Sequence, residues 1–247
     1  MMAYRASFAI EMFVEIGYMI AQIIFFNILY GNLSSISGWT RYEMLFLIGI
    51  DMFVGELIIG MIFANNTNTL PEKIRNGDVD FTLLKPVGSL FFLTLSSTYL
   101  PSLFTSLIGI YFICIAISHL TIVWSLLNIL GFIIIFLCGF IISYSVMVII
   151  ASLSFIFINA KPLPRLGMNT MIQFTDKPFQ MFDGVFLKII FFFIFPSVFI
   201  TSIPVHTIIK GLNYIFLFQA IFLAGIFLFL VNWIWSKMIA RYSSASS

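Results

Sequence analysis

Long apolar runs separated by short polar stretches dominate this chain. The runs cover residues 17–30, 43–64, 90–117, 126–158, 185–203 and 214–235. Their apolar positions are continuous, whereas strands of a membrane barrel alternate apolar and polar positions. A helix that crosses a bilayer needs about 20 mostly apolar residues, and most of these runs are about that long or longer. The pattern therefore predicts an all-α membrane protein with six transmembrane helices in one domain, residues 1–247.

The first 16 residues differ from these runs because charged positions interrupt them. Glu11 and Glu15 lie four residues apart, which places them on one face of a helix. Apolar residues continue beside that face, as in an amphipathic helix that lies along the membrane interface. The alternative is that these residues form the polar start of the first span.

Two polar segments interrupt the apolar pattern at greater length. Residues 66–88 lie between the second and third spans, and residues 159–184, which carry prolines and basic residues, lie between the fourth and fifth. In the first segment, Asn76-Gly77-Asp78 is a turn signal, and Asp78 and Asp80 are suited to the start of a short helix. We expect both segments to lie in the cytoplasm.

The same segment mixes charged residues with apolar residues that favour burial. Lys85 precedes Pro86, which disfavours a helical backbone at residue 85 and ends the irregular part. Phe81, Leu83 and Leu84 favour an apolar contact, while the charged residues around them cannot lie in hydrocarbon. A short amphipathic helix pressed against a cytoplasmic partner satisfies both requirements. The alternative is a helix that rests on the membrane surface without a partner.

Composition and charge support the membrane assignment and give it an orientation. The chain is 61% hydrophobic and 9% charged, whereas soluble domains carry about 25% charged residues. With both termini in the cytoplasm, only Arg41 and Lys210 of the 12 basic residues fall outside the cytoplasmic segments. Cytoplasmic loops of membrane proteins are enriched in Lys and Arg. We therefore expect a multi-pass membrane protein with both termini in the cytoplasm.

Asp51 and Glu56 are the candidate functional residues inside the membrane. Each lies within the apolar run 43–64 and costs about 2.5 kcal/mol or more at the bilayer centre unless it meets a partner or water. Five residues correspond to about 140° of α-helix, so the two carboxylates cannot share one narrow face. They line a translocation path or form hydrogen bonds to other spans, and the sequence leaves both interpretations open.

The chain lacks the motifs of common enzymes and of ATP binding. It contains no GxxxxGK[ST] phosphate loop, no HExxH, no GxSxG and no CxxC, and His119 and His206 are isolated from other metal-ligating residues. We therefore expect no catalytic residues, no metal site and no cofactor on this chain. If transport uses ATP, the ATP and Mg²⁺ must bind to a separate polypeptide.

Residues 76–87, NGDVDFTLLKPV, resemble a signature of the bacterial ABC-2 type permease family. Three further stretches also resemble that family: Trp39 with Glu43, FIFPSVFITSIPVHTIIKG at residues 193–211, and RYSSASS at the end of the chain. The resemblance implies a six-helix exporter subunit that pairs with a second permease chain and with separate ATP-binding subunits. The loop between spans 2 and 3 would then hold a coupling helix that docks on the ATPase. The residues assigned to this role are Gly77, Asp78, Asp80, Leu83, Leu84, Lys85 and Pro86.

The resemblance leaves the substrate open, because relatives export drugs, antibiotics and lipid-like molecules. Two other classes of function compete with it. An ion-coupled secondary transporter would use Asp51 and Glu56, but the two halves of the chain show no internal repeat that would support it. An intramembrane enzyme, such as a lipid-modifying transferase, would need clustered polar residues that the sequence does not offer.

Overall fold

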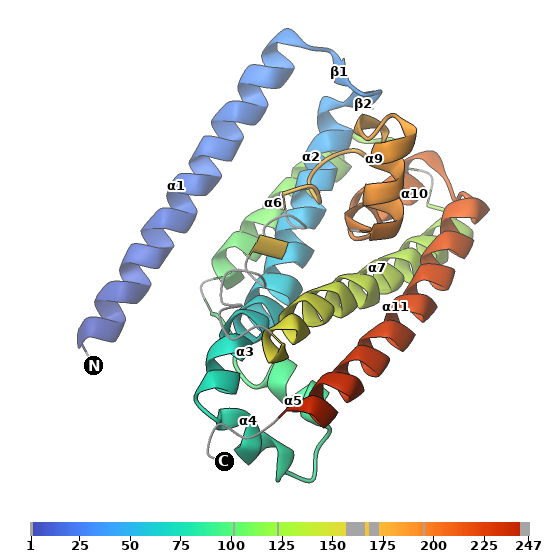
Figure 1. Ribbon diagram of the computed structural model, residues 1–247. Coiled ribbons are helices and arrows are strands. Elements are labelled where there is room, and N and C mark those ends of the chain that lie inside the picture. The colour runs from blue at the N-terminus through green and yellow to red at the C-terminus, as the bar shows by residue number, and fades with distance from the viewer. Residues whose placement is uncertain are drawn as a thin grey trace.

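A computed structural model describes residues 2–100, 102–122, 124–156, 166–167, 173–194 and 196–242. Within these residues the chain is almost entirely helical, and its strands are β1 (Ser35–Ile36) and β2 (Trp39–Thr40), which form an antiparallel hairpin. The long helices form an elongated bundle with α1 along one side (Figure 1). The structure therefore agrees with the predicted all-α membrane protein.

The bundle has two ends, which we name by the elements that lie there. The β-hairpin end holds β1 and β2, and the α4 end holds the short helix α4 (Asp78–Leu83) (Figure 1). Helix α1 (Met2–Asn32) starts and helix α11 (Tyr214–Arg241) finishes toward the α4 end. The two chain ends thus lie at the same end of the bundle, as a protein with an even number of passes requires.

Helix α1 is continuous over its 31 residues. At 1.5 Å per residue it is about 46 Å long, well beyond the roughly 30 Å of a hydrocarbon core. No break separates residues 1–16 from the first span, so the predicted separate interfacial helix is wrong. The alternative interpretation, a polar start of the same helix, agrees with the structure, although the side chains of Glu11 and Glu15 lie outside the described residues.

The second predicted span, residues 43–64, is confirmed as helical. Helix α2 (Arg41–Ile50), the π-helix η1 (Asp51–Ala64) and helix α3 (Asn65–Arg75) follow one another directly. The side chain of Glu43 stabilises the start of α2, because its Oε2 atom accepts a hydrogen bond of 2.8 Å from the backbone N–H of Thr40. Glu43 therefore satisfies one of the N–H groups that every helix start leaves unpaired.

The third predicted span, residues 90–117, is not one helix. Helix α5 (Ser89–Leu95) ends before a non-helical stretch, and α6 (Ser102–His119) begins after it. Pro101, between α5 and α6 in the sequence, lies outside the described residues. The break occurs where Ser96 and Ser97 form hydrogen bonds to the side chain of Asn66, which offer the backbone an alternative to helical bonding.

Helices α7 (Leu126–Ser152) and α11 pack against each other. In the part of the chain that the structure describes, they are the two helices long and apolar enough to cross a membrane by length and composition. The 3₁₀ turn η2 (Leu153–Phe155) extends α7 at the α4 end, where the ring of Phe155 meets the ring of Trp235 at 5.7 Å. The fourth and sixth predicted spans are confirmed as helices. Shorter apolar helices cover Ile20–Gly31, Ser106–His119 and Val185–Ile194.

Residues 185–203 do not form a fifth span. This part of the chain consists of α9 (Val185–Ile189), the π-turn η4 (Ile190–Ile194), the 3₁₀ turn η5 (Ser197–Phe199) and α10 (Ser202–Lys210). Just before it, in η3 (Phe179–Met181), Gln180 accepts a 2.7 Å hydrogen bond from the Trp39 indole. At its other end, Lys210 forms an ion pair with Glu43. Both contacts lie at the β-hairpin end, so the chain enters and leaves at the same end.

The middle of this re-entrant segment, residues 185–210, reaches the middle of α7. A Cβ atom at Gly139 would lie 2.0 Å from the backbone oxygen of Phe199, so η5 sits directly against the helix surface. Phe199, Ile203 and Ile142 are fully buried in the core that joins this segment to α7 and α11. The apolar composition that suggested a span is therefore explained by burial inside the protein.

The re-entrant segment also changes the position of residues 173–184. The hydrogen bond between Trp39 and Gln180 places residue 180 at the β-hairpin end, the same end as residues 31–42. The sequence predicted that residues 159–184 lie on the opposite side from residues 31–42, and this prediction is wrong for residue 180. Phe155 lies at the α4 end, and Phe174 packs on Phe191 of the re-entrant segment with ring centroids 4.5 Å apart.

Candidate functional site

The segment that the sequence singles out forms a helical turn and a short helix at the α4 end. Helix α3 ends where the backbone N–H of Asn76 donates to Glu72 and that of Gly77 donates to Ile74. Gly77 has φ of 78°, a left-handed conformation that only glycine adopts without strain. Asp78 and Asp80 follow in the first turn of α4, where the partial positive charge of a helix start favours carboxylates. The predicted short helix is confirmed.

Helix α4 has one buried face and one exposed face, each defined by residues three positions apart. Val79 and Thr82 are buried against a cluster that includes Leu93. On the other face, Phe81 is 72% exposed and Leu84 is 83% exposed. Because residues three apart are neighbours on a helix surface, these two large apolar side chains form one exposed patch.

The residues after α4 extend this patch with a cation. The Lys85 ammonium lies 3.6 Å from the centroid of the Phe92 ring, a cation–π contact that holds the lysine against α5. Pro86 and Val87 follow as exposed residues. We call the exposed residues Asp78, Phe81, Leu83, Leu84, Lys85, Pro86 and Val87 the α4 patch.

A buried asparagine joins the two helices that carry α4. The Asn66 side chain, at 0% exposure, donates to the Ser97 carbonyl at 2.7 Å and accepts from the Ser97 amide at 3.0 Å. The Oγ atoms of Ser96 and Ser97 also donate to its Oδ1 atom. These bonds fix the start of α3 against the end of α5, so α4 is carried on two joined arms.

Lys73 adds a weaker link between the same arms. Its ammonium donates to Ser96 Oγ at 3.2 Å. Burial lowers the pKa of the Lys73 ammonium, and the carboxylate of Asp78 partly opposes this shift. A lysine placed here therefore makes a polar link between α3 and α5 at the cost of partial desolvation.

The arms contact helices α7 and α11. The indole N–H of Trp235 in α11 donates to Ser89 Oγ at the start of α5, at 3.1 Å. The hydroxyls of Thr94 in α5 and Tyr144 in α7 lie 3.2 Å apart. A displacement of α4 would therefore be transmitted through α5 to both α7 and α11.

The structure does not bring Asp51 to this site. Asp51 is half-buried at the start of η1, and its Oδ1 atom lies 3.4 Å from the place of a Cβ atom on Gly55. Because η1 is a π-helix, in which hydrogen bonds join residues five apart, the 140° separation expected for an α-helix does not apply to positions 51 and 56. The side chain of Glu56 lies outside the described residues, and the translocation path stays a prediction.

The structure also adds residues to the site that the sequence did not assign to it. Phe81 forms half of the exposed apolar patch; the sequence indicated an apolar contact for it, but the resemblance did not place it among the coupling residues. Asn66 was hidden in a run of polar residues, because nothing local distinguishes it from its neighbours Asn65 and Asn68. At the other end of the molecule, the Glu43–Lys210 ion pair joins residues that are far apart in the sequence.

Comparison with known proteins gives one match over nearly the whole chain. The sequence model of the family described as "ABC-2 family transporter protein" matches residues 16–246. Neither curated proteins nor solved structures gave a match.

Proposed function

This chain belongs to the ABC-2 transporter family, whose members are membrane transport components, and we propose that it is the permease subunit of an ATP-driven exporter. In this proposal the α4 patch docks on a separate ATP-binding subunit. That subunit holds the ATP and Mg²⁺, and the permease performs no bond chemistry. A second permease chain, identical or related, completes the transporter.

The observation that carries the proposal is the exposed apolar face of α4 next to its buried face. Phe81 and Leu84 are largely exposed, although they belong to a helix whose other side is packed into the bundle. Exposed apolar side chains rimmed by polar residues mark interaction sites. Asp78 and Asp80 at one end and Lys85 at the other supply such a rim, which a bilayer interior would not tolerate.

The transport step follows from how α4 is held. Closure of the ATP-binding subunits on ATP would move α4, and the Asn66 contacts would make α3 and α5 move with it. The contacts of α5 with Tyr144 and Trp235 would then carry the motion to α7 and α11. Helices α7 and α11 contact the re-entrant segment. Their movement would change the access of the substrate to the β-hairpin end of the bundle.

We place the α4 end in the cytoplasm of a bacterial cell and expect six passes. Among the described residues, α1, α2 with η1, α6, α7 and α11 run between the two ends of the bundle (Figure 1). The basic residues at the α4 end, Lys73, Arg75, Lys85, Lys237 and Arg241, support this orientation. The excess of basic residues at the α4 end is smaller than the sequence predicted. Lys177 and Lys188 lie toward the β-hairpin end, as do Arg41 and Lys210. The exported substrate is a drug-, antibiotic- or lipid-like molecule.

The proposal is tested by purification of the full chain from its native membrane. Replacement of residues 77–86 by a Gly/Ser linker of equal length should remove a co-purifying ATPase subunit. The same replacement of residues 33–38, at the other end, should leave the ATPase bound. If the ATPase stays bound without residues 77–86, the docking role is wrong. Transport that runs on a proton gradient without ATP, and stops in Asp51→Asn, would instead support an ion-coupled transporter.

A further inference from the structure

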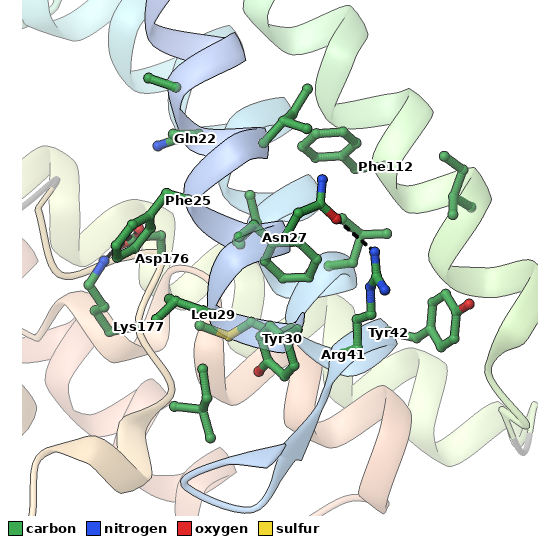
Figure 2. Close-up of a pocket in the computed structure, with 18 of the residues that line it drawn as sticks. Gln22, Phe25, Asn27, Leu29, Tyr30, Arg41, Tyr42, Phe112, Asp176 and Lys177 are labelled. Atoms are coloured by element: carbon green, nitrogen blue, oxygen red, sulfur yellow. Dashed lines mark hydrogen bonds and ion pairs between the residues drawn. The ribbon is translucent and has the colours of Figure 1, made fainter. Parts of the chain in front are cut away.

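A cavity of about 840 Å³ lies toward the β-hairpin end, between α1, α2, α6 and residues 176–181 (Figure 2). Its volume falls within the range of about 300–1,000 Å³ that is typical of small-molecule sites. It lies at the opposite end from the α4 patch. Nothing in the proposed coupling role uses it.

The walls of the cavity are mostly apolar. Helix α1 contributes Phe25, Phe26 and Leu29, and α2 and α6 contribute Met44 and Phe112. Figure 2 shows Asn27 of α1 directed toward Arg41 at the start of α2. A cavity lined in this way disfavours water, because water needs two to four polar partners. An apolar ligand body fits it better.

One side of the cavity carries a positive charge. Arg41 lies at the start of α2, and its Nη2 atom donates to Asn27 Oδ1 at 2.7 Å (Figure 2). Among the described residues, Arg41 has no carboxylate partner, since Lys177 pairs with the one carboxylate that lines the cavity, that of Asp176, at 2.6 Å. The lining therefore has one net positive charge, and it belongs to a guanidinium with N–H donors to spare.

Two polar rings lie beside this charge. The imidazole of His119, at the end of α6, stacks on the phenol ring of Tyr42 with centroids 4.2 Å apart, and both residues line the cavity. Together with Asn27 they offer hydrogen-bonding groups around Arg41. The cavity thus combines an apolar body with a cationic, hydrogen-bonding rim.

We propose that this cavity binds an anionic phospholipid of the surrounding bilayer. One acyl chain would lie between α1 and α6, and the phosphate would receive charge-assisted hydrogen bonds from Arg41. Arginine matches the geometry of phosphate oxygens, with two parallel N–H donors. In this proposal the bilayer surrounds the outer face of α1, where Ile24 is 54% exposed, and the lipid would enter the cavity beside α1. The bound lipid would hold α1 against the rest of the bundle.

The test uses the full chain in nanodiscs of phosphatidylcholine that contain phosphatidylglycerol with a photoreactive group in one acyl chain. After illumination, labelled peptides are mapped by mass spectrometry. Label should appear on α1 around residues 21–30 and on α6 around residues 111–119. Arg41→Gln should reduce this label about tenfold, the loss expected for a hydrogen bond to a charged group. Arg241→Gln, at the other end, should not change it.

A second pair of variants tests the acyl-chain position without a change of charge. Leu29→Trp fills the cavity and should remove the label from α6, whereas Ile24→Trp on the outer face of α1 should leave it. Label that is insensitive to both Arg41→Gln and Leu29→Trp would overturn the site. Equal labelling by a photoreactive phosphatidylcholine would overturn the charge preference. The measurement uses no ATP, so its outcome is independent of the coupling role.

Discussion

Phe81 and Leu84 offer the most direct test of the docking surface, because they are exposed in this chain and buried only if a partner covers them. Full burial of a Phe or Leu side chain contributes about 1.5–3 kcal/mol. Phe81 is 72% exposed and Leu84 is 83% exposed, so most of that free energy remains available to a partner. We expect Phe81→Ala and Leu84→Ala each to weaken ATPase binding by about 1–2 kcal/mol, roughly five- to thirtyfold.

The assay is titration of the purified ATPase subunit against the permease in nanodiscs, with ATPase stimulation as a second readout. The matched control is Phe218→Ala, because Phe218 is 70% exposed but lies in α11 toward the β-hairpin end. The thermal unfolding midpoints of Phe81→Ala and Leu84→Ala should stay close to that of the parent, since neither side chain is packed. Val79→Ala, by contrast, removes a fully buried side chain and should lower the midpoint.

The reasoning is refuted if Phe81→Ala and Leu84→Ala bind the ATPase as tightly as Phe218→Ala does. The exposed face of α4 would then rest on the membrane, which is the alternative that the sequence left open. A loss of binding together with a lower unfolding midpoint would show that the two side chains support the fold. Either result would contradict the proposal that the exposed face of α4 is the docking surface.

Three further outcomes test the framework around the site. Asn66→Ala should lower the free energy of unfolding by about 2–3 kcal/mol, because it removes the hydrogen bonds that a fully buried side chain makes to Ser97, as measured by denaturant unfolding in detergent. Gly139→Leu should lower it by about 1–3 kcal/mol, because the side chain would meet the backbone of Phe199. In a variant that lacks Cys114 and Cys138, Ser37→Cys and Gln180→Cys should react with a membrane-impermeant maleimide from the same side.

Each of these has a control within the chain. Asn232→Ala removes an exposed side chain that bonds only within its own helix, to the Leu228 carbonyl, and should change stability little. Gly225→Leu is the control for Gly139→Leu, because no atom outside its own stretch of helix lies within 4 Å of the place of a Cβ atom on Gly225. If positions 37 and 180 react from opposite sides of the membrane, residues 185–203 cross the membrane, as the sequence predicted.

The local sequence determined where the long helices and the short helix α4 lie. Continuous hydropathy located the helices at 43–64, 126–158 and 214–235, because twenty apolar residues need no distant contact to favour a buried helix. Asn76-Gly77-Asp78 located the turn before α4, because a left-handed glycine and a capping carboxylate act over a few residues. These features depend on neighbours in the chain, so they can be read from it.

Only the tertiary structure decided how the chain runs through residues 159–210. Hydropathy reports that a segment avoids water, and it does not distinguish a helix facing lipid from one buried against protein. The contact of Gly139 with Phe199, the Trp39–Gln180 hydrogen bond and the Glu43–Lys210 ion pair turn residues 185–210 into a re-entrant segment. Trp39 and Gln180 are 141 positions apart, and no local pattern in the sequence could have paired them.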